Sequence, residues 1–233
     1  MSNLSSESSI WKAKLPQLSL ILITIIWGTT FVVVKYGLTF ASPVLFVALR
    51  FMAAAIAVTL ISWKYLKGMT AFEVFAGAVI GLLIALGYGT QTVGLQTISS
   101  SESAFLTALY VPLVPILLWL LFRKKPHVMT WIGAALAFLG LVFLTGNGFG
   151  AIQLSFGQLL TILGSIAIAL EIIFISYFAP KVNTRHVTVL QLIFASLFCF
   201  IMAAMLGEPL LPEFHPHLAI ILVGLGIASA VIQ

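Results

Sequence analysis

Long apolar runs, each about the length of a helix that crosses a bilayer, constrain this chain more than any motif. A bilayer core about 30 Å thick needs about 20 helical residues at about 1.5 Å each. Seven such runs, separated only by short links, are Leu18–Tyr36, Pro43–Trp63, Val74–Leu95, Ala104–Phe122, Met129–Thr145, Leu154–Phe178 and Val187–Leu206. An eighth run begins near Leu218 and continues to Gln233. The sequence therefore predicts an all-α polytopic membrane protein.

The scarcity of charge excludes a soluble domain. Of the 233 residues, 61% are hydrophobic and 7% are charged, with a mean hydropathy of +1.19, whereas soluble domains carry about 25% charged residues. The apolar runs are continuous and do not alternate with period two, which favours helices over a β-barrel. Despite the net charge of +5, no nucleic-acid partner is expected, because the basic residues lie in short clusters between the runs.

The basic clusters also predict an orientation in the membrane. With the N-terminus in the cytoplasm, nine of the eleven Lys and Arg residues fall on the cytoplasmic side, as the positive-inside rule requires. Residues 1–17 are expected to form a disordered cytoplasmic tail, because no small-residue cleavage site of a signal peptide precedes Leu18. Lys35 and Arg50 fall outside this pattern, and Lys35 is expected to snorkel from the outer end of its span.

Two parts of the chain resemble each other when the sequence is shifted by about 141 residues, a shift that we call the repeat offset. It aligns the first run with the sixth and the second with the seventh without a gap, and places Tyr36 on Tyr177. Five spans separate the equivalent helices, and because five is odd the second copy must be inserted upside down. Inverted repeats of this kind are typical of secondary transporters, whose binding site lies between the halves near the midplane.

Four segments carry a more specific resemblance. They are Ile26–Lys35, Leu49–Phe51, Ser99–Tyr110 and Trp131–Gly140. They are similar to the first, second, fourth and fifth helices of the EamA family, which belongs to the drug/metabolite transporter superfamily. The resemblance implies ten helices in two inverted five-helix repeats, and export or import of amino acids or other small metabolites across a bacterial inner (plasma) membrane.

The family architecture divides the chain into two repeats. Residues 18–145 are expected to form the first EamA repeat of five helices, and residues 154–233 an incomplete second repeat of about three helices. If the repeat is about 141 residues long, the second copy lacks roughly 50 residues, so the sequence is expected to be either a fragment or an unusual chain that pairs with a second copy as a homodimer. Many relatives carry a Glu just before the fifth helix, where this sequence has Arg123–His127, so no role is carried over for that Glu.

Signatures of enzymatic or ATP-driven chemistry are missing from the sequence. It has no phosphate-binding Gly-rich loop, no HExxH motif and no cysteine pair, and no buried His–carboxylate arrangement is expected. His215 and His217 are expected in a solvated loop and not at a metal, and His127 and His186 are assigned to the basic clusters. The chain is therefore not expected to be an enzyme, with no catalytic residues, cofactor or metal.

Ionisable residues within spans are candidate functional groups, because lipid makes them costly. Glu171 is the only acid well inside a span, and it is expected to be protonated or paired. It suits a proton-coupling or substrate-amine site, with a structural pair as the alternative. Arg50, about 10 Å into the second span, can counter a substrate carboxylate, although such residues more often lock helices together.

Five further residues are expected to line a substrate cavity: Trp27, Thr30, Tyr88, Gln91 and Tyr110. Tyr88 and Gln91 share one helix face, and Trp27 and Thr30 stand three residues apart near the midplane. The two prolines that follow Tyr110 are expected to bend the fourth span. Packing seams are expected at two pairs of glycines, Gly77 with Gly81 and Gly133 with Gly140.

Three functions fit these features. The first is a secondary active transporter of small organic metabolites such as amino acids, most readily an exporter, that works by alternating access with protons as the expected coupling ion. The second is a passive channel, which needs a continuous polar stripe that these apolar spans do not provide. The third is a non-transporting membrane scaffold or subunit. Saturable transport and counterflow in reconstituted vesicles separate the three.

Overall fold

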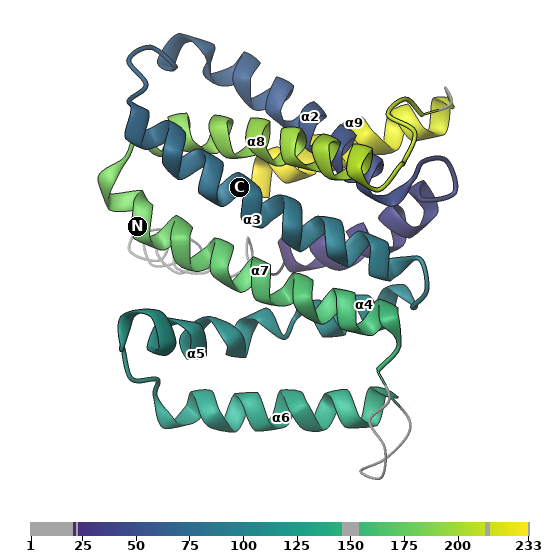
Figure 1. Ribbon diagram of the computed structural model, residues 1–233, viewed down its shortest axis with the longest axis vertical. Helices are drawn as coiled ribbons and strands as arrows, with labels where there is room; N and C mark the ends of the chain where they lie inside the picture. The colour runs from purple at the N-terminus through teal and green to yellow at the C-terminus, as the bar shows by residue number, and fades with distance from the viewer. Residues whose placement is uncertain (1–20, 22, 146–153, 213–214, 233) are drawn as a thin grey trace, which may run out of the picture.

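The computed structural model describes residues 21, 23–145, 154–212 and 215–232, and the regular structure in this part of the chain is helical (Figure 1). The predicted tail, residues 1–17, lies outside the described residues. The first helix is Ile23–Gly37. The others are α2 (Pro43–Ser62), α3 (Ala71–Leu95), α4 (Ser100–Thr107), α5 (Tyr110–Phe122), α6 (Val128–Thr145), α7 (Phe156–Phe178), α8 (Thr184–Met205) and α9 (Pro216–Ile232), with 3-10 turns η1 (Trp63–Tyr65) and η3 (Ala179–Lys181).

The expected all-helical membrane fold is confirmed. Five segments of the described chain are long and apolar enough to cross a membrane: Pro43–Tyr65, Ala71–Leu95, Ser100–Phe122, Phe156–Lys181 and Thr184–Met205. The remaining apolar helices, such as Val128–Gly140, are shorter. Polar side chains set where the helices begin, since Thr70 with Glu73 and Ser155 with Gln158 form capping boxes at α3 and α7.

Helix α3 lies at the centre of the bundle. It packs along α7 on one side and α8 on the other, α8 packs against α2, and α2 packs against α9 (Figure 1). Helices α4 and α5 lie on the far side of α7, and α6 lies beyond α5 at the edge of the bundle. Two buried layers result, one between α2, α3 and α8 and a smaller one beneath the first helix and α9.

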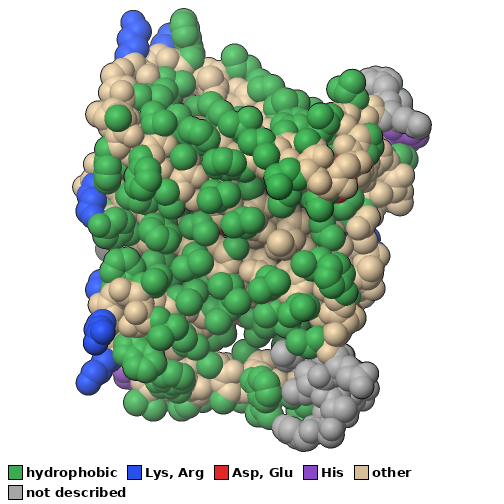
Figure 2. All heavy atoms as spheres, in the orientation of Figure 1, with side chains coloured by type: hydrophobic (Ala, Val, Ile, Leu, Met, Phe, Trp, Pro, Cys, Tyr) green, Lys and Arg blue, Asp and Glu red, His purple; other side chains and the backbone are tan. Residues whose placement is uncertain are grey.

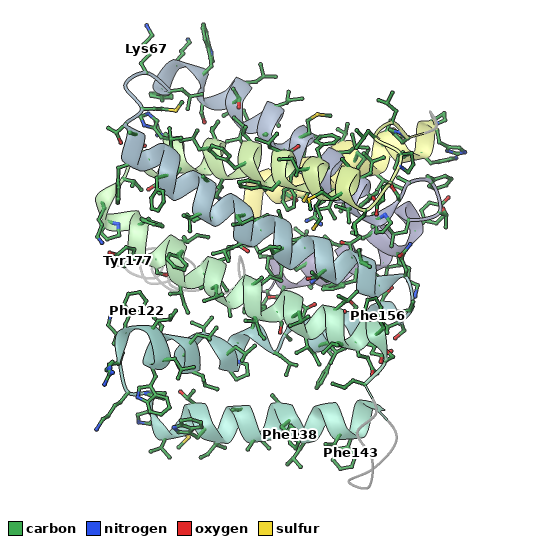
Figure 3. All side chains as sticks on the ribbon, viewed as in Figure 1. Lys67, Phe122, Phe138, Phe143, Phe156 and Tyr177 are labelled. Atoms are coloured by element: carbon green, nitrogen blue, oxygen red, sulfur yellow. The ribbon has the colours of Figure 1, made fainter. Side chains whose placement is uncertain are left out.

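The two ends of the bundle differ in charge. Lys and Arg side chains gather along one edge (Figure 2). Lys67, Phe122 and Tyr177 lie at this end, which we call the basic end, whereas Phe143 and Phe156 lie at the opposite end (Figure 3). The clustering matches the expected pattern of charge, and the assignment of the basic end to the cytoplasm stays a prediction.

The fourth span is broken between α4 and α5. Two i to i−3 hydrogen bonds, from Leu109 N to Leu106 O at 3.2 Å and from Val111 N to Ala108 O at 3.0 Å, tighten the backbone there. This tightened turn precedes Pro112, which has no N–H to donate to the preceding turn. The helix is therefore interrupted just before Tyr110, and the bend expected from the two prolines stays a prediction.

Glycines allow α3 to approach both of its neighbours closely. A Cβ on Gly81 would lie 2.7 Å from Gln191 O of α8, and one on Gly94 would lie 2.6 Å from Gly157 O of α7. The seam expected at Gly77 and Gly81 is thus present, and the one between α3 and α7 was not anticipated. A Cβ on Gly133 meets nothing within 4 Å, so the expected seam at that residue is wrong.

Lys35 bonds to a backbone carbonyl near the end of its own helix. Its Nζ donates a hydrogen bond to the carbonyl oxygen of Ile98, just beyond the end of α3, and the side chain is half-buried. The expected snorkelling of this side chain toward the interface stays a prediction.

Candidate substrate cavity

Two adjoining cavities lie among the first helix, α2, α3, α7 and α8. The larger, about 310 Å³, contains Glu171 in its wall and is called the Glu171 cavity. The smaller, about 20 Å³, contains Arg50 and is called the Arg50 cavity. Trp27, Tyr88 and Ile168 line both, so a single wall separates the two spaces. An acid and a base therefore flank one aromatic partition inside the bundle.

Glu171 is a buried acid without a partner for one of its oxygens. It lies near the middle of α7, and only 6% of its surface is exposed. Its Oε2 atom makes no hydrogen bond to any residue that the structure describes. A buried carboxylate oxygen in this state is costly unless a proton or a cation binds it. Glu171 is thus available to bind a ligand from the cavity.

Arg50 is held by neutral groups. Its Nε donates a hydrogen bond to Ser229 Oγ of α9 at 3.0 Å. Its guanidinium carbon lies 5.5 Å from the ring centroids of both Phe51 and Tyr88, which is within cation–π range. It forms no ion pair within the described part of the chain. Its positive charge is therefore positioned but not neutralised.

The remaining predicted site residues surround this pair. Gln91 Nε2 donates to Thr107 Oγ1 at 2.8 Å, and both residues line the Arg50 cavity. Thr30 lines it too, and its Oγ1 donates to Trp27 O at 2.6 Å. Tyr110 lines neither cavity, but its ring meets that of Trp27 edge-on with centroids 6.4 Å apart. The structure thus brings six predicted residues to the cavity walls and places Tyr110 behind one of them.

Sequence reasoning missed two lining residues of α8 and one residue of α9 that holds Arg50. Thr188 and Gln191 line the Glu171 cavity, and Ser229 positions Arg50. The repeat offset gives a signal for Gln191, because it aligns that residue with Arg50. Ser229 carries no such signal, since only the packing of α9 on α2 brings it near.

A buried His–carboxylate pair, which the sequence was expected to lack, lies at the basic end. His186 Nδ1 is 3.0 Å from Glu73 Oε2, and both side chains are buried. The expectation that His186 only adds orienting charge is also wrong. The two residues are 113 positions apart, and only the contact between the first turns of α3 and α8 brings them together.

A bundle of membrane-spanning helices around a buried site with both charges is the arrangement of a membrane transporter. Residues 15–146, more than half of the chain, match the EamA-like transporter family. The chain therefore belongs to this family of transporters.

The chain is also similar to several curated transporters. An uncharacterized transporter of Archaeoglobus fulgidus is 35% identical over 71% of this chain and 50% of its own length. The uncharacterized transporter YvbV of Bacillus subtilis is 25% identical over 79% of this chain and 61% of its own length. The uncharacterized inner membrane transporter YedA of Escherichia coli is 31% identical over 61% of this chain and 49% of its own length. The chain thus spans about half the length of the curated relatives it matches.

Proposed function

We propose that the chain is a secondary active transporter of small metabolites that carry both charges, such as amino acids, and that it works by alternating access. The observation that carries this proposal is the placement of Glu171 and Arg50 on two cavities with a common wall, where, among the described residues, one oxygen of Glu171 has no hydrogen-bond partner and Arg50 has no ion pair. Export is the direction we expect, across a plasma membrane with the basic end in the cytoplasm.

The chemistry of the two cavities suits a zwitterion. A carboxylate binds a substrate ammonium group, and a guanidinium binds a substrate carboxylate by paired charge-assisted hydrogen bonds. Trp27 and Tyr88 lie between them and offer aromatic faces to a cation or an apolar side chain. A volume of about 310 Å³ is at the small end of ligand sites, which favours a metabolite over a peptide.

The cavity linings support an inverted repeat. The repeat offset carries the start of α2, Pro43, onto the start of α8, Thr184, and the end of the first helix onto the end of α7. Five residues of the Arg50 cavity each have a counterpart at the same offset that lines the Glu171 cavity. The pairs are Trp27 and Ile168, Thr30 and Glu171, Phe31 and Ile172, Val34 and Ile175, and Arg50 and Gln191. Equivalent positions around one centre are what two inverted halves produce.

Competition for Glu171 supplies a coupling mechanism. A buried carboxylate must bind either a proton or the substrate ammonium, because its bare charge is unstable in the bundle. Release of the substrate on one side then requires a proton to replace it. Substrate and proton therefore move in opposite directions, which lets a proton gradient drive export.

Substitution of Arg50 by Gln tests the proposed role of the guanidinium. We expect the KM for an amino acid to rise about tenfold or more, because the lost charge-assisted hydrogen bond contributes about 1.5–3 kcal/mol. The KM for the matching amino acid amide, which lacks the carboxylate, should change little. Both are measured by uptake into proteoliposomes.

The control for this experiment is Ser229→Ala, which removes the partner of Arg50 but keeps its charge. It should weaken binding of the amino acid much less than Arg50→Gln. If Arg50→Gln raised the KM for the amino acid and for its amide equally, Arg50 would only hold the helices together.

A further inference from the structure

Two carboxylates at opposite ends of the bundle bind the N-termini of α2 and α8. These helices pack side by side and run antiparallel, since the start of α8 meets the start of α3 and the end of α8 meets the start of α2. Exposed N–H groups and the helix dipole make each N-terminus a site for negative charge. In both cases the carboxylate comes from a distant segment.

Glu208 caps α2 from the end of α8. Its Oε2 accepts hydrogen bonds from Val44 N at 3.1 Å and Leu45 N at 2.9 Å. Ser42, the residue at the N-cap of α2, makes no side-chain cap. Gly207, with φ +72°, and the bond from Glu208 N to Ala203 O at 2.9 Å form the turn that holds Glu208 in place.

Glu73 binds α8 from the start of α3. Its Oε1 accepts a hydrogen bond from Asn183 N, at the N-cap of α8, at 2.8 Å. Its Oε2 accepts from Thr70 N at 2.8 Å and faces His186 Nδ1 at 3.0 Å. Glu73 lies in the first turn of α3, which begins four residues after Lys67, and Lys67 lies at the basic end (Figure 3).

His186 extends the contact to the end of α2. Its Nε2 lies 2.8 Å from the carbonyl oxygen of Tyr65 in η1, while Nδ1 faces Glu73. Both ring nitrogens thus face acceptors, and both bonds form only when both nitrogens carry a proton. With both nitrogens protonated, the contact is an ion pair that joins the ends of three helices, α2, α3 and α8.

The two helices that receive these contacts are equivalent under the repeat. The repeat offset places Ser42, the N-cap residue of α2, on Asn183, the N-cap residue of α8. The offset does not align the two acids, since Glu73 lies in the first turn of α3 and Glu208 in the turn after α8, but each binds the second helix of the other repeat. The bonds of Glu73 to Asn183 and of Glu208 to Val44 and Leu45 therefore join the two halves that must separate in alternating access.

We propose that Glu73 and Glu208 are paired gate residues: the Glu73 contact closes the basic end, the Glu208 contact closes the opposite end, and each breaks when the carrier opens on its own side. This inference rests on the proposed function of an alternating-access carrier. Rocking of one half against the other opens one contact while the other stays closed. In the present structure both contacts are formed.

The test measures the opening of each end with reporter cysteines. Cys199, the single cysteine of the sequence, is first replaced by Ala. Thr188→Cys then reports on the Glu171 cavity near the basic end, and Val34→Cys reports on the Arg50 cavity near the opposite end. Labelling by a maleimide is followed in detergent micelles, where the reagent reaches both ends at once.

We expect Glu73→Gln to speed labelling of the Thr188→Cys reporter by about threefold or more and to slow labelling of the Val34→Cys reporter. Glu208→Gln should do the reverse. Gln at position 73 keeps the capping box of α3 but loses the ion pair with His186. If Glu73→Gln does not fold, His186→Gln removes the same ion pair, leaves Glu73 on Asn183, and should give the same shift.

The matched control is Ser99→Ala, at the same end as Glu208. Ser99 Oγ accepts a hydrogen bond from Glu102 N, so this variant also removes a bond at the N-terminus of a helix, but both partners lie within the first repeat and neither rate should change. Faster labelling of both reporters, unchanged rates in Glu73→Gln and Glu208→Gln, or the same shift in Ser99→Ala would overturn the gate proposal. Because labelling does not require transport, opposite shifts in a chain that moves no substrate would retain the gates and refute only the proposed function.

Discussion

Replacement of Glu171 by Gln is expected to lower proton-driven transport about 100-fold. Gln cannot exchange a proton for a substrate ammonium, and the lost interaction with a charged group contributes up to about 3 kcal/mol. The side chain keeps its size, and one of its oxygens has no partner to lose among the described residues. The measurement is substrate accumulation in proteoliposomes with and without an imposed pH gradient.

The control is Glu102→Gln, which makes the same chemical change at the start of α4, away from both cavities. It should leave the response to the pH gradient intact. Transport by Glu171→Gln that still follows the pH gradient as in the wild type would exclude Glu171 as the coupling residue. An equal loss of substrate accumulation in both variants would point to a general effect on assembly of the protein.

Replacement of Gly94 by Leu is expected to cost about 3 kcal/mol of stability or to prevent assembly of the bundle. The new Cβ would lie 2.6 Å from Gly157 O and 2.6 Å from Thr161 Oγ1. A backbone oxygen cannot move aside as a side chain can, so α3 and α7 must separate. The measurement is the thermal midpoint of the detergent-purified protein, followed by near-UV circular dichroism.

Gly133→Leu is the control for this substitution. Gly133 lies on an exposed face of α6, where a Cβ meets nothing within 4 Å, so its thermal midpoint should stay close to that of the wild type. A similar loss in both variants would mean that Leu destabilises these helices by another route, and that the α3–α7 seam is not tightly packed.

The helices themselves could be predicted because their length and hydrophobicity are local properties of the sequence. The expected second span, Pro43–Trp63, differs by one residue from α2, Pro43–Ser62, and the expected sixth ends where α7 ends, at Phe178. The lateral order of helices was not predictable in this way. Nearly uniform apolar faces such as those of α2 give no direction for packing, and the close approach of Gly94 to Gly157 depends on both helices at once.

The charged residues of the candidate site could be predicted from the sequence, but their hydrogen-bond partners could not. Glu171 and Arg50 stand out because a charge within an apolar run is costly wherever it points. Their surroundings come from helices far away in the sequence, as with Ser229 beside Arg50. For the same reason, the contact between Glu73 and His186 was missed, since each residue alone lies where an ordinary helix end is expected.

Counterflow is the measurement that decides whether the chain is an alternating-access carrier. Proteoliposomes of the purified protein are loaded with an excess of one unlabelled amino acid and diluted into a trace of the same radiolabelled amino acid, for each common amino acid in turn. We predict that at least one label accumulates transiently above equilibrium and that its uptake saturates. Non-saturable flux without counterflow would indicate a channel, and no flux for any amino acid would contradict the proposed transport of zwitterions.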